Sequence, residues 1–329
     1  MAQTAQTFLV TGGAGFIGSS FVNQQIQKNR KIIVLDKLTY AGKEENLSWI
    51  KPAGNYELIK GDINDKNLLE EIFNRNKIDK IIHFAAESHV DNSIKNPDAF
   101  IQTNINGTHN LLKIALQAFQ TNPNFHFHHI STDEVFGDLP LNTADKFTED
   151  TPYNPSSPYS ASKAASDHLA RAYHKTYNLP ITISNCSNNY GPRQHEEKLI
   201  PTIIKKALNN EQIPIYGDGK NVRDWIHVDD HNKAIDLILE KGEIGQTYLV
   251  GGNSELDNNQ VVTIICQMLD ELKPKEDKTS YRSQITYVTD RKGHDRRYAI
   301  DDSKIVKELG FKREFDFKTG IRQLIADSI

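Results

Sequence analysis

Three glycines near the start of the chain constrain its fold more than any other feature. The run TGGAGFIG places Gly12, Gly15 and Gly18 between an apolar β-type stretch at 8–12 and a helical pattern at 15–29. Glycines at this spacing allow a tight turn, close approach of the backbone to a diphosphate, and close packing of the helix on the strand. The start of the helix also offers unpaired N–H groups, which favour a phosphate. The sequence therefore predicts a dinucleotide-binding strand, loop and helix.

Apolar stretches that alternate with helical patterns continue through the first half of the chain. Beyond 8–12, strands are expected at 31–36, 56–62, 79–86, 125–132 and 180–188, and helices at 65–76, 98–120 and 158–177. Strands that are apolar throughout and separated by helices are typical of a parallel sheet covered on both faces. The chain is therefore predicted to have an α/β fold with a Rossmann-type doubly wound parallel sheet.

The second half of the chain has a different pattern. From about residue 189 it contains loops rich in glycine and proline, a few helical patterns and a short β-type run at 283–290. We expect a smaller, loop-rich C-terminal lobe that binds the substrate, with domains at 1–188 and 189–329. The stretch 225–252 has the pattern of a helix followed by a strand, and it is expected to pack back on the first domain.

Composition and charge exclude several classes of protein. Of the 329 residues, 37% are hydrophobic and 25% charged, and the net charge of −4 favours neither a nucleic-acid nor a membrane partner. No stretch is apolar over the length needed to span a bilayer. The two cysteines, Cys186 and Cys266, lie far apart and form neither a disulfide framework nor a zinc cluster. We therefore expect a reducing, cytoplasmic location.

Three histidines in the fifth predicted strand invite a metal-site interpretation. In a strand, His126 and His128 share one face and His129 points to the other. Their neighbours are typical of a buried core. We therefore expect core histidines and no metal.

Two acids follow predicted strands of the first half. Asp36 ends the second strand, where a carboxylate binds the ribose hydroxyls of adenosine and repels a 2′-phosphate. This position favours NAD over NADP as the cofactor. Asp62, after the third strand, is expected near the adenine, and an ordinary loop carboxylate is the alternative.

A tyrosine and a lysine lie one helical turn apart in YSASK. Tyr159 and Lys163 are spaced i, i+4 and therefore share one face of the predicted helix. A tyrosine phenol has a pKa of about 10, and a nearby ammonium together with a positively charged nicotinamide ring would favour its phenolate. Such a pair can accept a hydroxyl proton while a hydride leaves the same carbon. Alone, the motif would indicate two exposed residues on one helix. Because it follows a dinucleotide-binding loop, it predicts a catalytic site.

Several motifs together resemble the extended short-chain dehydrogenase/reductase family, whose members act on nucleotide sugars. They are TGGAGFIG, HFAAESHVD at 83–91 and YSASK, and the likeness covers essentially the whole chain. NNYGP (188–192), EKLIP (197–201), PIYGDGKNVRDWIHVDDH (214–231) and DRKGHDRRYAID (290–301) resemble the substrate lobe of the family's sugar-nucleotide dehydratases. That pattern usually has tyrosine at the position of Phe136 and proline at the position of Lys292. Neither position is expected to carry the chemistry.

The acids that follow the fifth predicted strand indicate the type of reaction. Thr132, Asp133 and Glu134 occupy a position where related epimerases typically have Ser or Thr next to small or neutral residues. Transfer and return of a hydride at one carbon needs no further acid or base. Two added carboxyl groups therefore imply elimination of water beside a transient ketone. Neighbouring acids in a dry cleft tend to differ in pKa, so that one can serve as acid and the other as base.

The resemblance implies a role for each of these residues. Tyr159 would accept the proton of the sugar C4 hydroxyl, with Lys163 holding the phenolate and Thr132 hydrogen-bonding the reacting oxygen. Glu134 would remove the C5 proton, and Asp133 would protonate the departing C6 hydroxyl. The implied substrate is dTDP-glucose, the product is dTDP-4-keto-6-deoxyglucose for rhamnose-type deoxysugar synthesis, and NAD would stay bound. A 4-epimerase, a dehydratase of another nucleotide sugar such as a UDP-sugar, and an inactive NAD-sensing protein are the alternatives.

The motifs and the resemblance together give the predicted binding residues. Those for the cofactor are Gly12, Gly15, Phe16, Ile17, Gly18, Asp36, Asp62, Ile63, Ala85, Ala86, Thr103, Tyr159, Lys163 and Asn189. Those for the substrate are Glu87, Thr132, Asn188, Lys198, Leu199, Pro214, Tyr216, Arg223, Asn258, Arg291 and His294. Guanidinium groups bind phosphate oxygens through paired hydrogen bonds, which suits the arginines to a diphosphate.

The helical patterns at 98–120 and 158–177 carry apolar side chains on more than one side. Packing on the sheet explains only one apolar side of a helix. With the family likeness, this predicts a homodimer in which two helices of each copy form a four-helix interface.

Overall fold

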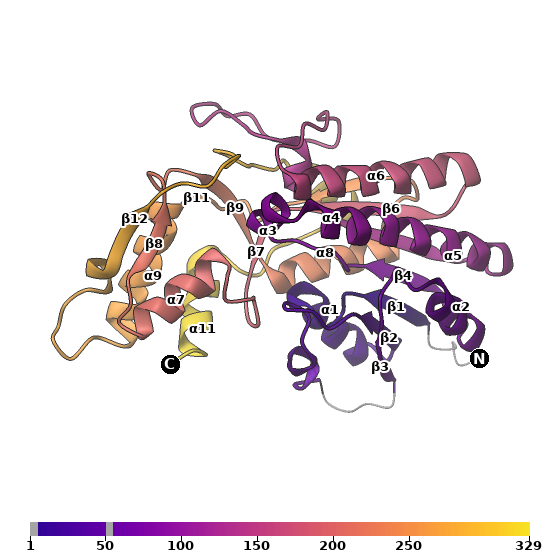
Figure 1. Cartoon of the computed structure of the whole chain (residues 1–329), viewed down its shortest axis with the longest axis horizontal. Coiled ribbons are helices and arrows are strands. Elements are labelled where there is room, and N and C mark those ends of the chain that lie inside the picture. The colour runs from indigo at the N-terminus through magenta and orange to yellow at the C-terminus, as the bar shows by residue number, and fades with distance from the viewer. Residues whose placement is uncertain (1–5, 51–54) are drawn as a thin grey trace.

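A parallel sheet forms the centre of the computed structural model, which describes residues 6–50 and 55–329 (Figure 1). Within these residues it has seven strands in the order β10-β6-β5-β4-β1-β2-β3. Their bounds are Thr7–Thr11 (β1), Lys31–Asp36 (β2), Tyr56–Lys60 (β3), Lys80–His83 (β4), His126–Thr132 (β5), Ile181–Cys186 (β6) and Thr247–Val250 (β10). The order runs outward from β1 to β3, then returns to β4 on the other side of β1. The predicted doubly wound α/β fold is confirmed.

Helices cover both faces of this sheet. One face carries α1 (Phe16–Gln27) and α8 (Val228–Lys241), and the other carries α2 (Lys66–Arg75), α5 (Thr108–Thr121) and α6 (Pro158–Tyr177) (Figure 1). Successive strand residues alternate between these layers: Phe8 and Val10 join the core under α1 and α8, whereas Leu9 joins the core under the other three helices. The apolar strand runs are therefore explained by burial on both sides.

The helix expected at 98–120 is present as one continuous helical segment at 97–121, but its middle is π-helical. Helix α3 (Val90–Lys95) precedes α4 (Pro97–Phe100), which continues into a π-helical stretch, Ile101–Gly107, before α5 begins. In this stretch the Asn104 side chain accepts a hydrogen bond from the Glu87 N–H at 2.9 Å and donates one to the Glu87 carbonyl at 3.0 Å. The wider turn thereby joins the helix to the loop after β4. Such π turns are frequent at functional sites.

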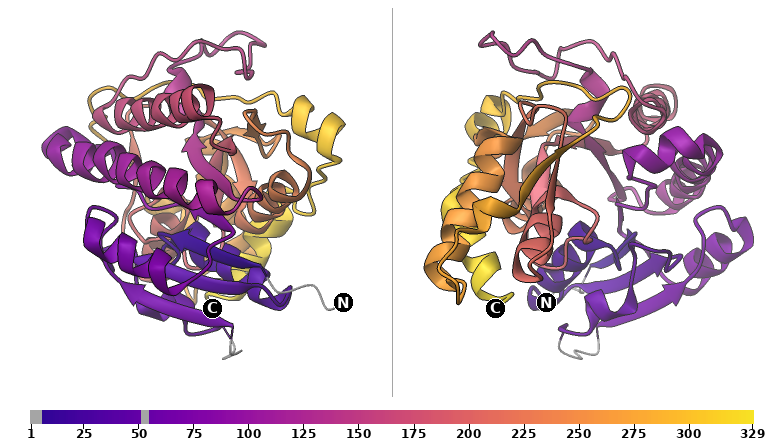
Figure 2. Two further views of the ribbon diagram at one scale, coloured as in Figure 1. Left: turned by 90° about the vertical axis from the view of Figure 1, so that its right-hand side faces the viewer. Right: turned by 60° about the vertical axis from the view of Figure 1, so that its left-hand side comes forward.

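The second half of the chain builds smaller sheets. Strands β7 (Asn188–Tyr190), β9 (Val222–His227) and β11 (Glu255–Asp257) form one, and β8 (Ile213–Tyr216) pairs in parallel with β12 (Ile285–Val288). The helices are α7 (Leu199–Leu208), α9 (Asn258–Leu272), α10 (Ser303–Leu309) and α11 (Phe317–Ala326). Figure 2 shows most of these elements gathered on one side of the central sheet.

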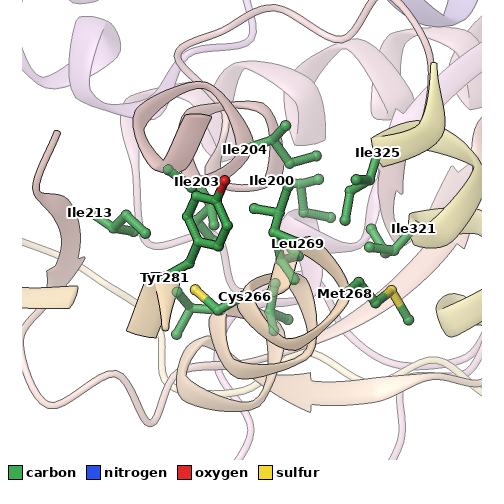
Figure 3. Close-up of a cluster of buried hydrophobic side chains, with 14 of the residues drawn as sticks. Ile200, Ile203, Ile204, Ile213, Cys266, Met268, Leu269, Tyr281, Ile321 and Ile325 are labelled. Carbon is green, nitrogen blue, oxygen red and sulfur yellow. The ribbon is translucent and has the colours of Figure 1, made fainter. Parts of the chain in front are cut away.

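The second half also has its own hydrophobic core. Isoleucines of α7, including Ile203, face Cys266 and Leu269 of α9, while Ile321 of α11 closes the cluster (Figure 3). The stretch 225–252 packs on the first half of the chain, as expected. Its strand β10 pairs with β6 at the edge of the central sheet, and its helix α8 packs on α1. The division of the chain at residue 188 stays a prediction.

The three histidines of β5 occupy two faces, as expected. His126 and His128 both lie 2.8 Å from the Thr182 hydroxyl, whereas His129 Nε2 lies 3.0 Å from Asp167 Oδ1. In the described part of the chain, no group of three or more potential ligands could hold a metal ion. Among the same residues, no helix is long and apolar enough to cross a membrane.

Substitution of Gly18 by alanine tests the close contact between α1 and the loop before it. A Cβ at this position would lie 2.3 Å from the Gly12 carbonyl oxygen. We expect Gly18→Ala to lower the free energy of unfolding by about 1–3 kcal/mol, as overpacking does, in urea denaturation without NAD. Gly15→Ala is the matched control, because its Cβ would lie 3.2 Å from the same oxygen. Equal stability of Gly18→Ala and the wild type would contradict the contact.

Candidate active site

A cleft opens at the carboxyl ends of the central strands, where the strand order reverses between β1 and β4. Its walls include the ends of β1, β2, β5 and β6, the loop after β4, and residues that follow β6. Ligands of doubly wound folds bind at this reversal point. The strand order alone therefore predicts that a ligand binds in this cleft.

The glycine loop forms one end of the cleft. Gly12 has a φ of +71°, and a Cβ there would lie 2.5 Å from the backbone nitrogen of Ala85. Gly15 caps α1 without a side-chain hydrogen bond, which leaves the first N–H groups of the helix to other partners. The space that a Cβ at Gly12 would fill lies next to the start of α1, whose first N–H groups have no side-chain cap. This arrangement fits the diphosphate of a dinucleotide.

Two carboxylates line the same end. The Asp36 oxygens accept hydrogen bonds from the N–H groups of Ala14 and Leu38, each at 2.9 Å. Burial raises the pKa of Asp36, and these two hydrogen bonds oppose the rise. Asp62 forms an ion pair with Lys37 at 2.8 Å. Burial raises the pKa of Asp62, but the hydrogen bond from Lys37 and other contacts outweigh it and hold that pKa below its usual range.

The opposite end of the cleft holds the tyrosine and lysine of α6. The helix starts at Pro158 with a capping box between Ser157 and Ser160, so Tyr159 and Lys163 lie in its first two turns. Their exposed fractions are 8% and 4%. Lys163 Nζ donates a hydrogen bond to the carbonyl of Ile130 at 2.8 Å, which ties the ammonium to β5.

Asp133 and Glu134 lie in a 3₁₀ turn directly after β5, and their environments differ. Asp133 is 2% exposed, and burial together with the charge of Glu134 raises its pKa well above the ordinary value. Burial also raises the pKa of Glu134, but the charges of Arg223, Arg291 and Lys198 oppose this. Asp133 is thereby favoured as the neutral acid, and Glu134 as the ionised base.

The pKa of Tyr159 is also raised well above its ordinary value. Burial is the largest cause and the charge of Glu134 the next, while the hydrogen bond with Thr132 lowers the pKa. The chain alone therefore holds Tyr159 as a neutral phenol.

Cations from the second half of the chain approach the two acids. Arg223 is almost fully buried, with its guanidinium 4.1 Å from the centre of the Tyr298 ring. Arg291 lies 3.5 Å from Asp91 of α3, and its buried Nε has no hydrogen-bond partner among the described residues. Lys198 Nζ donates to the Ser88 carbonyl at 3.3 Å. Of the three cations only Lys198 lines the cleft, and the positive charge that they bring close to the acids suits a diphosphate.

The structure brings most of the predicted site residues into one cleft. All of the predicted cofactor residues and all of the predicted catalytic residues line it, as do Glu87, Asn188 and Lys198 of the substrate set. The substrate residues outside its lining are Leu199, Pro214, Tyr216, Arg223, Asn258, Arg291 and His294. Of these, Arg223 and Arg291 still act on the charge of Glu134. The individual roles stay predictions.

Sequence reasoning missed three residues of the 191–198 loop that line the cleft, Gln194, His195 and Glu197. In this loop Arg193 lies over the Trp49 ring at 3.8 Å, and His195 meets the edge of the Tyr40 ring at 5.4 Å. Glu197 lies 3.6 Å from His89, which precedes α3. The sequence marked a loop here and placed Lys198 in the substrate set, but neither signal indicates what the other residues of the loop contact.

The chain matches known proteins along nearly its whole length. Residues 9–324 match the family model described as GDP-mannose 4,6 dehydratase. A dTDP-glucose 4,6-dehydratase of Xanthomonas campestris is 52% identical, over 96% of this chain and 91% of the relative. The chain belongs to the dTDP-glucose 4,6-dehydratase family.

Solved structures place this family within a wider fold. The dTDP-glucose 4,6-dehydratase of Streptomyces venezuelae, crystallised with NAD and dTDP, is 43% identical with a TM-score of 0.89, over 98% of this chain and 96% of that one. A UDP-glucose 4-epimerase of Thermotoga maritima has a TM-score of 0.87 at 27% identity, over 98% of both chains. Because epimerases share the fold, the fold alone does not separate a dehydratase from an epimerase.

Replacement of Asp36 by asparagine tests its role in holding a dinucleotide. The amide places an NH₂ group against one of the two N–H donors, so a buried donor loses its acceptor. This costs about 1–3 kcal/mol, and we expect the dissociation constant of NAD to rise about 10- to 100-fold. Calorimetry on nucleotide-free protein measures it. Asp65→Asn is the control, because Asp65 also accepts a backbone hydrogen bond but lies outside the cleft. Unchanged NAD binding by Asp36→Asn would contradict the assignment.

Proposed function

We propose that the chain is an NAD-dependent hydro-lyase that converts dTDP-glucose to dTDP-4-keto-6-deoxyglucose. The observation that carries this proposal is the pair of acids, buried Asp133 and half-buried Glu134, which lines one dinucleotide cleft together with Tyr159 and Lys163. The identity of 52% to a relative named for this activity supports it. The neighbour crystallised with NAD and dTDP supports both the cofactor and the nucleotide.

The glycine loop and Asp36 hold the cofactor at one end of the cleft. When bound, NAD supplies a hydride acceptor for C4 of the sugar and a hydride donor for C6. Since both transfers occur within one turnover, the chain has no need to release it. The 191–198 loop supports retention, because its His195 meets the Tyr40 ring and both residues line the cleft.

The chain's own residues move the protons. Tyr159 accepts the proton of the C4 hydroxyl, stabilised by the charge of Lys163, and Thr132 hydrogen-bonds the same oxygen. The resulting ketone acidifies the C5 proton, which Glu134 removes. Asp133 gives its proton to the C6 hydroxyl, which leaves as water. After C6 has received its hydride, C5 regains a proton, which Glu134 donates after exchange with solvent. The proton gained by Tyr159 and the proton lost by Asp133 balance over one turnover.

The raised pKa values set a pH window for this chemistry. Glu134 must be ionised, so activity is lost as the pH falls through its raised pKa. Asp133 must be neutral, so activity is lost as the pH rises through its own pKa, which is raised further. The window therefore lies above the ordinary range of carboxyl groups.

Other functions fit the acids less well. A 4-epimerase has no use for a second acid and base, and a protein that only senses NAD has no use for either the acids or the tyrosine. A dehydratase of another nucleotide sugar, such as a UDP-sugar, would use the same residues. The dTDP ligand of the Streptomyces venezuelae neighbour favours the thymidine nucleotide.

We also propose a homodimer that works in a reducing cytoplasm. Ile94 of α3 and Ile101 at the start of the π-helical stretch are 41% and 43% exposed, and Tyr177 at the end of α6 is half exposed. A second copy that pairs its α5 and α6 with those of the first would cover such side chains. The two free thiols, Cys186 and Cys266, suit a reducing compartment. The 6-deoxy product suits a role in rhamnose-type deoxysugar synthesis.

Replacement of Glu134 by glutamine separates oxidation from elimination. The amide cannot accept the C5 proton, whereas the groups that oxidise C4 stay intact. We expect overall turnover to fall at least about 100-fold, and reduced nicotinamide absorbance to build up on the enzyme after addition of dTDP-glucose. Stopped-flow absorbance measures both. Failure of any reduced cofactor to appear would remove Glu134 from the role of C5 base.

Tyr159→Phe is the matched control for this experiment. It removes the acceptor of the C4 hydroxyl proton and leaves both acids in place. The variant is expected to bind NAD and substrate without forming reduced cofactor. Near-normal reduction by Tyr159→Phe would contradict the assignment of the tyrosine.

A further inference from the structure

The Lys163 ammonium is buried without a contacting counter-ion. It is 4% exposed and donates a hydrogen bond to the Ile130 carbonyl, and within the part of the chain that the structure describes it forms no ion pair. A buried ammonium is strongly disfavoured unless a negative charge compensates it. Burial indeed lowers the pKa of Lys163, and the charge of Asp167 is the largest opposing influence. The proposed chemistry therefore needs an explanation of how Lys163 keeps its proton.

Asp167 follows Lys163 by one turn of α6 and is fully buried. Its Oδ1 accepts a hydrogen bond from His129 Nε2 at 3.0 Å. Its Oδ2 accepts from the hydroxyls of Ser131 at 2.8 Å and Tyr153 at 2.7 Å, and from the Asn185 amide at 3.3 Å. Donors that converge on both oxygens of a carboxylate stabilise its ionised form.

The hydrogen bonds that Asp167 accepts keep it ionised in spite of burial. Burial raises its pKa, but the hydrogen bonds from His129 and Tyr153 and the charge of Lys163 oppose this, and the net pKa is lowered. Asp167 therefore carries a negative charge inside the protein, one turn from the lysine on which Tyr159 relies.

The other titratable groups around Lys163 supply no competing anion. Burial lowers the pKa of His129 to about 4 and that of His83 on β4 well below its ordinary value, so both rings are neutral. Burial raises the pKa of the Cys186 thiol on β6 to about 12. Arg171, one turn beyond Asp167, donates to the Tyr153 hydroxyl at 2.7 Å. Of the acids after β5, Asp133 is favoured as neutral, and Glu134 is balanced by the cations of the second half.

We propose that Asp167 is a positioning residue for the reaction, whose buried negative charge keeps the Lys163 ammonium protonated for Tyr159. This rests on the proposed function, because Lys163 matters to catalysis through the tyrosine. Asp167 touches neither substrate nor cofactor, and it acts along α6. Its four donors hold the charge in place without neutralising it.

The test is Asp167→Asn in the NAD-bound enzyme, with isotope-labelled lysine. Nuclear magnetic resonance follows the titration of the Lys163 side chain, whose signal is the one missing from Lys163→Arg. Removal of the anion makes the charged lysine less favourable, so Lys163 loses its proton at lower pH. We expect its midpoint to fall by about one pH unit or more. In the Glu134→Gln variant, formation of reduced cofactor should decrease at high pH. Adding Asp167→Asn to this variant should move that decrease to lower pH by the same amount.

Tyr153→Phe is the matched control. It removes one neutral donor from Asp167 and leaves the charge, so the Lys163 midpoint should stay where it is. A merely structural role of Asp167 would lower the melting temperature and the rate at every pH without moving the midpoint. If Asp167→Asn does not fold, Asp167→Ser is a second neutral variant that leaves room for water.

The outcomes separate this proposal from the proposed function. An unmoved Lys163 midpoint in a folded neutral variant would overturn the role of Asp167, even where cofactor reduction proceeds normally. Absence of cofactor reduction in the Glu134→Gln parent with dTDP-glucose would overturn the proposed function, while the lysine titration would still decide whether Asp167 sets the charge of Lys163.

Discussion

Alignment of the parallel strands at one edge of the sheet is the constraint on which the whole site depends. Thr11 pairs with His83 and His83 with His129, while β5 and β6 continue together to Thr132 and Cys186. Segments far apart in the sequence therefore end at the same edge of the sheet. The glycine loop after β1 and the acids after β5 consequently open into one cleft. A shift of register in any of these strands would separate the cofactor end of the site from the reacting end.

Burial then differentiates groups that are chemically alike. Asp133 and Glu134 are neighbours in the sequence, yet the cations of the second half oppose the rise in pKa mainly at Glu134. Lys163 and Asp167 are both enclosed, and the charge of each favours the ionised form of the other. The second half of the chain thus lowers the pKa of Glu134 against the effect of burial, and under the proposed function the same cations also bind the diphosphate of the substrate.

The sequence predicted the parts of the structure that follow from local pattern. Helix α6 and strand β2 have the expected bounds, because the apolar pattern that defines each of them lies within one short segment of the sequence. The π-helical stretch at 101–107 was missed because apolar periodicity does not reveal an extra residue per turn. The contacts of Arg193 with Trp49, and the raised pKa of Tyr159, depend on how distant segments enclose one another. No pattern within a single segment carries that information.

The central claim is that oxidation and elimination of water occur in one cleft with a retained cofactor. The most direct measurement is the mass of the sugar nucleotide after incubation of dTDP-glucose with the purified protein in deuterium oxide, without added NAD. The account predicts a product that has lost one water and gained one carbon-bound deuterium at C5, where the proton removed by Glu134 is replaced from solvent. A sugar of unchanged mass with an inverted C4 would contradict it and would identify an epimerase instead.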